Sequence, residues 1–210
     1  KTGKPVVLVL MSGSAVSVPW AQDNIPAILQ AWYGGQAGGD ALADVLFGDY
    51  NPAGRLPVTF YKSVDDLPSF TDYSMKNRTY KYFEGEPLYP FGYGLSYSRF
   101  SYSGFNLPRK AEAGNTLKMS VQVTNQSQWA GDEVAQLYIS HLDVEGQEPI
   151  RSLAGFQKVH LEAGETRELN FRLSPDQLKR IDAGGNKVAP RGQVKLAVGG
   201  KQPGFKGSAD

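Results

Sequence analysis

The first sixty residues alternate continuous apolar runs with glycine-rich breaks. Every position from Val6 to Met11 is apolar, and a second short run, 27–33, ends in Gly34-Gly35. A continuous apolar run of this length is typical of a strand that is covered on both faces, as in the parallel sheets of α/β folds. A strand of that kind needs neighbours, and few other segments of this chain are suited to provide them.

A helix and a third strand are expected next. Over 38–48, Leu42 and Val45 lie on one helical face, and the segment ends in a glycine. Turn residues at 51–54 then precede a strand candidate at 56–60. Strand, strand, helix and strand are too little for a stable α/β domain. Residues 1–60 are therefore expected to be the C-terminal part of such a domain.

Residues 61–96 lose this periodicity and are rich in aromatic, proline and glycine residues. Polar linkers do not contain so many rings, because the rings would have to stay in contact with water. We therefore predict an ordered connector that packs against its neighbours.

From residue 97 to 210, apolar and polar positions alternate. Short alternating strands separated by turn signals are typical of an antiparallel sandwich of about 110 residues. Ser174 before Pro175 also predicts one helical turn over 174–178, with the serine as its cap. The fold class is therefore mixed, a partial α/β sandwich followed by an antiparallel β-sandwich, with a boundary near 95–100. The alternating segments are 117–123, 135–139, 169–173 and 194–198.

Composition removes several classes of function. The formal net charge of +1 does not indicate the broad positively charged surface that nucleic-acid binding requires. The chain has no cysteine and only two histidines, His141 and His160, so thiolate or histidine-rich metal sites are excluded and no metal is expected. The longest apolar run, 6–11, is far below the roughly 20 residues that span a bilayer, so no membrane partner is expected.

Several motifs resemble motifs of glycoside hydrolase family 3, and they follow one another in the same order as in that family. Segments 30–39 and 46–60 resemble the end of that family's α/β sandwich domain. Tyr89 to Tyr97 resembles the entry into its fibronectin type III-like domain, which has an immunoglobulin-like sandwich fold. Further landmarks within that domain are 131–138, 153–156 and 198–200.

The resemblance implies part of a retaining exo-β-glycosidase, a β-glucosidase or β-xylosidase acting on terminal β-linked sugars of plant-type oligosaccharides. Segment 78–83 is similar to the xylosidase-like branch. A retaining glycosidase needs two carboxylates about 5–5.5 Å apart and no cofactor. The family's nucleophile and acid/base precede the matched region, so no catalytic residue is assigned here. The implied partners are the N-terminal barrel and sandwich portions of the same enzyme, and a glycoside substrate.

Other features are better explained without catalysis. Glu84 and Glu86 flank Gly85 and would point the same way about 6.5–7 Å apart, but a solvated loop is the simpler interpretation. Segment 34–40 lacks the spacing of either phosphate-binding glycine motif. His141 and His160 are interpreted as surface or packing groups.

Arg78 and Tyr80 are the candidate substrate-binding residues. Aromatic faces and charged groups suit sugars, so this part of the connector is expected to line or buttress the outer substrate pocket, with inter-domain packing as the alternative. Two other classes stay open: a non-catalytic carbohydrate-binding or adhesion module, and a spacer that sets oligomerisation, for example a homodimer. The family resemblance favours a periplasmic or secreted location.

Overall fold

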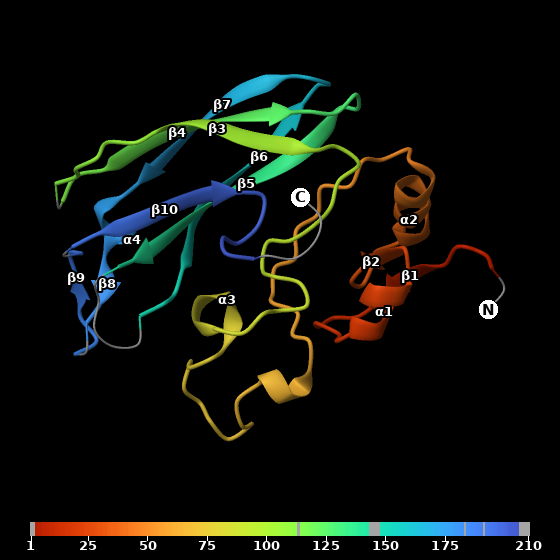
Figure 1. The fold of residues 1–210 in the computed structure, drawn as a ribbon, viewed down its shortest axis with the longest axis horizontal. Coiled ribbons are helices and arrows are strands. Elements are labelled where there is room, and N and C mark those ends of the chain that lie inside the picture. Colours follow the sequence, from red (N-terminus) through yellow and green to blue (C-terminus); the bar gives the residue numbers. More distant parts are fainter. Residues whose placement is uncertain (1–2, 113, 143–147, 183, 191, 206–210) are drawn as a thin grey trace.

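The computed structural model describes residues 3–112, 114–142, 148–182, 184–190 and 192–205. A small α/β part and a larger all-β part lie side by side, and the connector runs between them (Figure 1). Within the described ranges, no helix is long and apolar enough to cross a membrane.

The α/β part is built on two short parallel strands. β1 (Val7–Leu10) pairs in register with β2 (Ala27–Gln30), and α1 (Pro19–Asn24) lies between them in the chain. α2 (Gly38–Phe47) follows and ends at Gly48, whose φ of 88° is the left-handed conformation that glycine adopts without strain. The predicted strand pair and helix are confirmed, whereas α1 was not expected.

The prediction that the first strand is covered on both faces is not met within the described chain. Val6 is 52% exposed and Met11 is 65% exposed, and no residue of α2 is buried. The reason is that β2 is the only strand that pairs with β1 in the described residues. The apolar side chains of this part therefore form an open surface.

The predicted strand at 56–60 was wrong. Pro57 has no N–H to donate and the chain bends there, so only Phe60 forms an isolated antiparallel bridge, to Tyr89. Leu56 instead exchanges backbone hydrogen bonds with the connector: its N–H donates to Tyr93 at 2.8 Å and its carbonyl accepts from Gly92 at 2.8 Å.

The connector is ordered, as predicted, and contains the short helices η1 (Val64–Asp66) and α3 (Thr79–Tyr82). The Phe60 ring is 1% exposed and meets Tyr89 edge to face with ring centroids 6.0 Å apart. Tyr80 stacks on Phe91 with a centroid separation of 4.1 Å. Ring-to-ring packing therefore holds this segment in place.

The all-β part consists of two three-stranded antiparallel sheets facing one another (Figure 1). One sheet has the order β10-β5-β6 and the other β3-β4-β7. The helical turn α4 (Pro175–Leu178) has the predicted Ser174 cap, and a small sheet, β8 (Arg180–Ile181) with β9 (Lys187–Val188), follows it. The six main strands are β3 (Phe100–Asn106), β4 (Leu117–Asn125), β5 (Gly131–His141), β6 (Ser152–Leu161), β7 (Thr166–Leu173) and β10 (Val194–Gly199).

The predicted β-sandwich is confirmed, and its alternating apolar residues form one core between the sheets. Val121, Val123, Leu137, Leu161 and Leu173 are 0% exposed. All buried members of this core lie within 117–178, so the all-β part has a hydrophobic core of its own.

Candidate functional site: the cleft between the two parts

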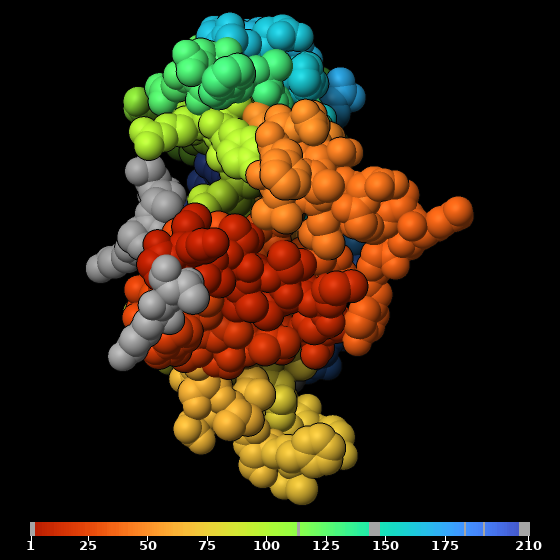
Figure 2. All heavy atoms as spheres, turned by 90° about the vertical axis from the view of Figure 1, so that its right-hand side faces the viewer, coloured from red at the N-terminus to blue at the C-terminus, as the bar shows by residue number. Residues whose placement is uncertain are grey.

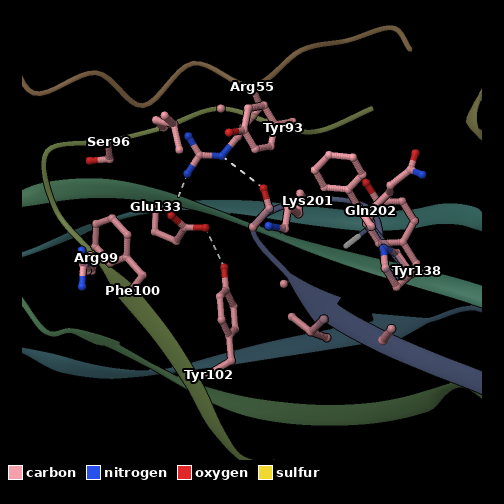
Figure 3. A pocket seen from close by; sticks show the side chains of 18 of the residues that line it. Arg55, Tyr93, Ser96, Arg99, Phe100, Tyr102, Glu133, Tyr138, Lys201 and Gln202 are labelled. Atoms are coloured by element: carbon pink, nitrogen blue, oxygen red, sulfur yellow. Dashed lines mark hydrogen bonds and ion pairs between the residues drawn. The ribbon is translucent and has the colours of Figure 1, made fainter. Parts of the chain in front are cut away.

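A cleft of about 760 Å³ lies where the α/β part, the connector and the all-β part meet. Arg55 and Tyr93 line it from one side, while Tyr102 and Glu133 line it from strands of the sandwich and Lys201 lines it from the segment after β10 (Figure 3). These residues come from segments far apart in the chain, so the cleft exists only once both parts are docked.

A buried ion pair crosses the cleft. Arg55 Nη2 lies 2.7 Å from Glu133 Oε2, and the two side chains are only 10% and 4% exposed. The Tyr102 hydroxyl donates to Glu133 Oε1 at 2.7 Å, from the opposite side (Figure 3). Burial and then the neighbouring carboxylate raise the pKa of Tyr102 well above its usual value, so this hydroxyl stays a donor.

Gly200 completes this network through its backbone carbonyl. The carbonyl accepts from Arg55 Nε at 3.2 Å and from Gln136 Nε2 at 2.8 Å. Gln136 Nε2 also donates to the carbonyl of Gly92 at 3.0 Å, while Gln136 Oε1 accepts from the Tyr138 hydroxyl. Gln136 therefore joins the connector to β5 and to the residue that follows β10.

Close packing at Gly92 requires a glycine. Its φ is +77°, and a Cβ atom there would lie 2.0 Å from Gln136 Oε1. Any side chain would push the connector away from the sheet.

Asn51 makes a second connection between the two parts. Its Nδ2 donates to the carbonyl of Ala130 at 2.8 Å and to Ser98 Oγ at 3.0 Å. Its Oδ1 accepts from Ser96 Oγ at 2.8 Å and from the Tyr97 N–H at 2.9 Å. One side chain thus ties the α/β part to the end of the connector and to the turn before β5.

The polar groups that line the cleft hold the two parts of the molecule together. Among the described lining residues Glu133 is the only carboxylate, and it is already paired with Arg55. A glycosidase needs two carboxyl groups with separate roles. The described residues also contain no cluster of His, Cys, Asp or Glu that could hold a metal ion.

Arg78 lies outside this cleft, in the connector. Its guanidinium donates to the backbone carbonyls of Ser69, Asp72 and Ser74, at 3.2, 2.6 and 3.1 Å. These contacts fix the preceding loop.

Tyr80 faces the sandwich. Its hydroxyl accepts from the N–H of Leu153 at 3.1 Å, and its carbonyl accepts from Arg151 Nη1 at 3.2 Å. Arg78 and Tyr80 are therefore two residues apart in sequence, but Arg78 contacts its own loop whereas Tyr80 contacts the sandwich.

The other candidates lie apart from the cleft. Glu86 pairs with Lys62 at 2.7 Å on the surface, so it is engaged in an exposed ion pair. His160 Nδ1 lies 2.7 Å from Asp132 Oδ1, and the His160 side chain is 58% exposed. Burial lowers the pKa of His141 at the end of β5.

The role of Glu133 was not predicted from the sequence, although a signal was present. Glu133 alternates with Ala135, Leu137 and Ile139 along β5, and all four are buried. A charged residue in an inward-facing series must have a buried partner, because an unpaired buried charge is costly. The partner, Arg55, is distant in sequence and could not be identified from spacing.

Comparisons with known proteins agree with this architecture. Residues 1–97 match the model of the glycosyl hydrolase family 3 C-terminal domain, and residues 133–202 match that of the fibronectin type III-like domain. A xylan 1,4-beta-xylosidase of Xylanibacter ruminicola is 44% identical over 94% of this chain and 23% of its own length. A periplasmic beta-glucosidase of Salmonella typhimurium is 38% identical over 85% of this chain and 25% of its own.

Solved structures show the same arrangement. Beta-glucosidase 3B of Thermotoga neapolitana superposes with a TM-score of 0.86 at 33% identity, covering 98% of this chain and 31% of that one. The beta-D-glucoside glucohydrolase of Trichoderma reesei superposes with a TM-score of 0.84 at 28% identity, covering 95% of this chain and 32% of that one. The fold is therefore that of a glycosyl hydrolase family 3 C-terminal domain followed by a fibronectin type III-like domain. The chain belongs to glycoside hydrolase family 3, and it spans 23% to 32% of the length of these four relatives.

Proposed function

We propose that this chain is the C-terminal part of a retaining exo-β-glycosidase, a β-glucosidase or β-xylosidase that removes terminal β-linked sugars from plant-type oligosaccharides. Its role is to complete the catalytic domains and to brace them. The observation that carries this proposal is the buried Arg55–Glu133 pair, which joins the α/β part to the sandwich. Removing one partner of such a pair costs about 3–5 kcal/mol, because the other charge stays buried and unpaired, so the contact between the two parts depends on both residues.

The open apolar surface of the α/β part supports the first role. Trp20 is 70% exposed and Phe47 is 84% exposed, in addition to Val6 and Met11. A part that leaves many large apolar side chains in contact with water has a surface that another protein part is expected to cover. We infer that the N-terminal barrel and sandwich portions of the same enzyme cover it.

Rigidity explains how a part without catalytic residues contributes to hydrolysis. The two catalytic carboxyl groups of a retaining enzyme are held about 5–5.5 Å apart. A displacement of about 1 Å by a distant change can lower the rate by about 10²-fold. The brace would keep the sandwich domain that carries the acid/base in position against the barrel. No cofactor takes part in this chemistry.

Arg78 and Tyr80 are proposed to buttress the outer substrate pocket. Arg78 fixes the loop before it, and Tyr80 anchors the following turn to the sandwich. We also propose a periplasmic or secreted location, which is supported by the relative named as a periplasmic beta-glucosidase.

The test compares this chain with the product of the complete gene. We expect the complete product to hydrolyse 4-nitrophenyl β-glucoside or β-xyloside and this chain alone to show no turnover. In the complete product, Glu133→Ala should lower kcat/KM and the melting temperature together. The surface change Glu168→Ala, on an exposed position of β7, should alter neither. Hydrolysis by this chain alone, or an E133A enzyme as active and stable as the parent, would contradict the proposal.

A further inference from the structure

A second cavity, of about 540 Å³, lies between the connector turn at 83–87 and the segment that follows β10. Ile150 and Arg151, just before β6, line it as well. The α/β part covers much of the face seen in Figure 2, in red and orange, but none of its residues lines this cavity. The connector and the all-β part therefore form the cavity, which does not belong to the open apolar surface. Its volume is in the range of small-molecule sites.

Gln202 lines the cavity with a buried acceptor that has no donor. The residue is 6% exposed, and no described residue donates a hydrogen bond to its Oε1 atom. Its backbone N–H donates to the carbonyl of Phe91 at 3.2 Å, so the connector holds it in place. Figure 3 shows its side chain beside Tyr138. A buried acceptor without a donor is unfavourable, so this atom points to a ligand that supplies one.

Arg151 adds a partly buried positive charge to the same cavity. Its Nη1 donates to the carbonyl of Tyr80 at 3.2 Å, and its Nη2 lies beside Gly204, 3.9 Å from where a Cβ atom would stand. Burial lowers the pKa of Arg151, and no carboxylate of the described residues pairs with it. A guanidinium keeps its charge in such surroundings. Anionic oxygens would satisfy both this charge and its remaining N–H groups.

The walls are fixed before any ligand binds. The N–H of Ile150 donates to the carbonyl of Lys81 at 2.7 Å, next to the contact between Arg151 and Tyr80. These bonds and the one from Gln202 hold the connector against both the start of β6 and the segment after β10. A site that is already in its binding conformation loses less entropy on binding.

We propose that this cavity binds a hexuronic acid unit, whose carboxylate pairs with Arg151 and one of whose hydroxyl groups donates to Gln202 Oε1. The rings of Phe83 and Phe205 and the ring of Pro87 provide the apolar walls for the C–H groups of the sugar. The inference goes beyond the proposed function, because binding at this place requires no hydrolysis.

The two polar groups favour a sugar acid over simpler ligands. A neutral sugar would leave the charge of Arg151 without a counter-charge, and a bare anion such as acetate would leave Gln202 Oε1 without a donor. The carboxylates of Glu84 and Glu86 lie at the cavity as well, but both residues are exposed, so water screens them. Glu86 also pairs with Lys62 at 2.7 Å.

The test is calorimetric titration of this chain and of the complete gene product with methyl β-D-glucuronoside. Methyl β-D-glucoside, which differs only in lacking the carboxylate, is the matched neutral ligand, and acetate is the matched anion. We expect the glucuronoside to bind with a Kd of about 1 mM or below. In this chain, the glucoside and acetate should each bind at least about tenfold more weakly, because each loses one of the two polar contacts.

Two variants test the two contacts separately. Arg151→Ala should lower the affinity for the glucuronoside at least about tenfold. Gln202→Met should lower it about three- to tenfold, while the melting temperature without ligand stays the same or rises, because the variant removes an unsatisfied buried acceptor. Should R151A fail to fold, Q202M tests the same site with Arg151 in place. Arg172→Ala, at an exposed position of β7 outside the cavity, is the control and should change neither quantity.

Four results would overturn this inference: no binding of the glucuronoside, equal affinity for the glucoside in this chain, equal affinity for acetate, or unchanged affinity in both R151A and Q202M. Binding by this chain but not by the complete product would also overturn it, because another part of the enzyme would then fill the cavity. A complete product that binds the glucuronoside through Arg151 but hydrolyses no glycoside would contradict only the proposed function.

Discussion

Gly131 lies so close to the side-chain amide of Asn51 that a Cβ atom at position 131 would come within 2.7 Å of Nδ2. The same Cβ would lie 3.0 Å from Ser98 Oγ. The start of β5 therefore lies too close to the Asn51 side chain to leave room for a Cβ atom. The amide of Asn51 fills this space and uses both its oxygen and its nitrogen there.

Asn51→Ala should lower the free energy of unfolding by about 2–3 kcal/mol, because several partly buried groups lose their hydrogen-bond partner at once. Gly131→Ala should destabilise the protein by a similar route, since the amide must move to admit the methyl group. Chemical denaturation of the purified chain measures both. Asn115→Ala is the control, because Asn115 is exposed and its side-chain amide donates to Glu112 within the same turn. Equal effects of N51A and N115A would show that the contact is unimportant.

Arg55 and Glu133 should show strong coupling in a double-mutant cycle. Arg55→Ala and Glu133→Ala should each cost about 3–5 kcal/mol, because each leaves a buried charge unpaired. The double variant should lose much less than the sum of the two. Tyr102→Phe removes only the hydroxyl that donates to Glu133 and should cost about 1–2 kcal/mol. Additive single effects would contradict a direct interaction.

The two histidines should titrate on opposite sides of the usual histidine pKa. The hydrogen bond to Asp132 raises the pKa of His160, while burial lowers the pKa of His141. With only two histidines in the chain, their imidazole signals can be followed by NMR. Asp132→Asn should bring the pKa of His160 down and leave His141 where it is. A common pKa for both would contradict these environments.

The free energy of unfolding should depend on pH in the way that these pKa shifts require. Because the pKa of His160 is raised, the stabilisation that His160 contributes is present below the unfolded pKa of 6.5. It is lost as pH rises through the folded pKa. The hydrogen bond from Lys158, followed by that from His160, lowers the pKa of Asp132. The stabilisation that Asp132 contributes is present above the unfolded value of 3.8 and is lost as pH falls through the folded pKa. Salt should weaken both effects, since the pair is exposed.

Phe47→Glu should have different effects on this chain and on the complete gene product. Phe47 is 84% exposed here, so the stability of this chain should change by less than about 0.5 kcal/mol. If the N-terminal portions cover α2, the same change should lower the melting temperature of the complete product by several degrees. Phe105→Glu should leave both proteins unchanged. An unchanged melting temperature of the complete product would show that Phe47 lies outside the proposed contact.

The local elements could largely be predicted because they depend on neighbours in sequence. Alternation along 117–123 and 169–173 set the faces of β4 and β7, and Ser174-Pro175 set the start of α4. The strand predicted at 56–60 failed because its hydrogen bonds go to Gly92 and Tyr93 in the connector, where Pro57 and the bend rule out a regular ladder.

The class of fold, the order of the two parts and the family could be predicted from the sequence, since periodicity and motif order are properties of the chain. The pairing of Glu133 with Arg55, the contacts of Asn51 with both parts, and the exposure of Phe70 and Tyr73 became visible only in the folded molecule. Each of these depends on contacts between residues far apart in the chain or on how fully a side chain is covered. No spacing along the sequence encodes such distances, because they arise only when the two parts dock.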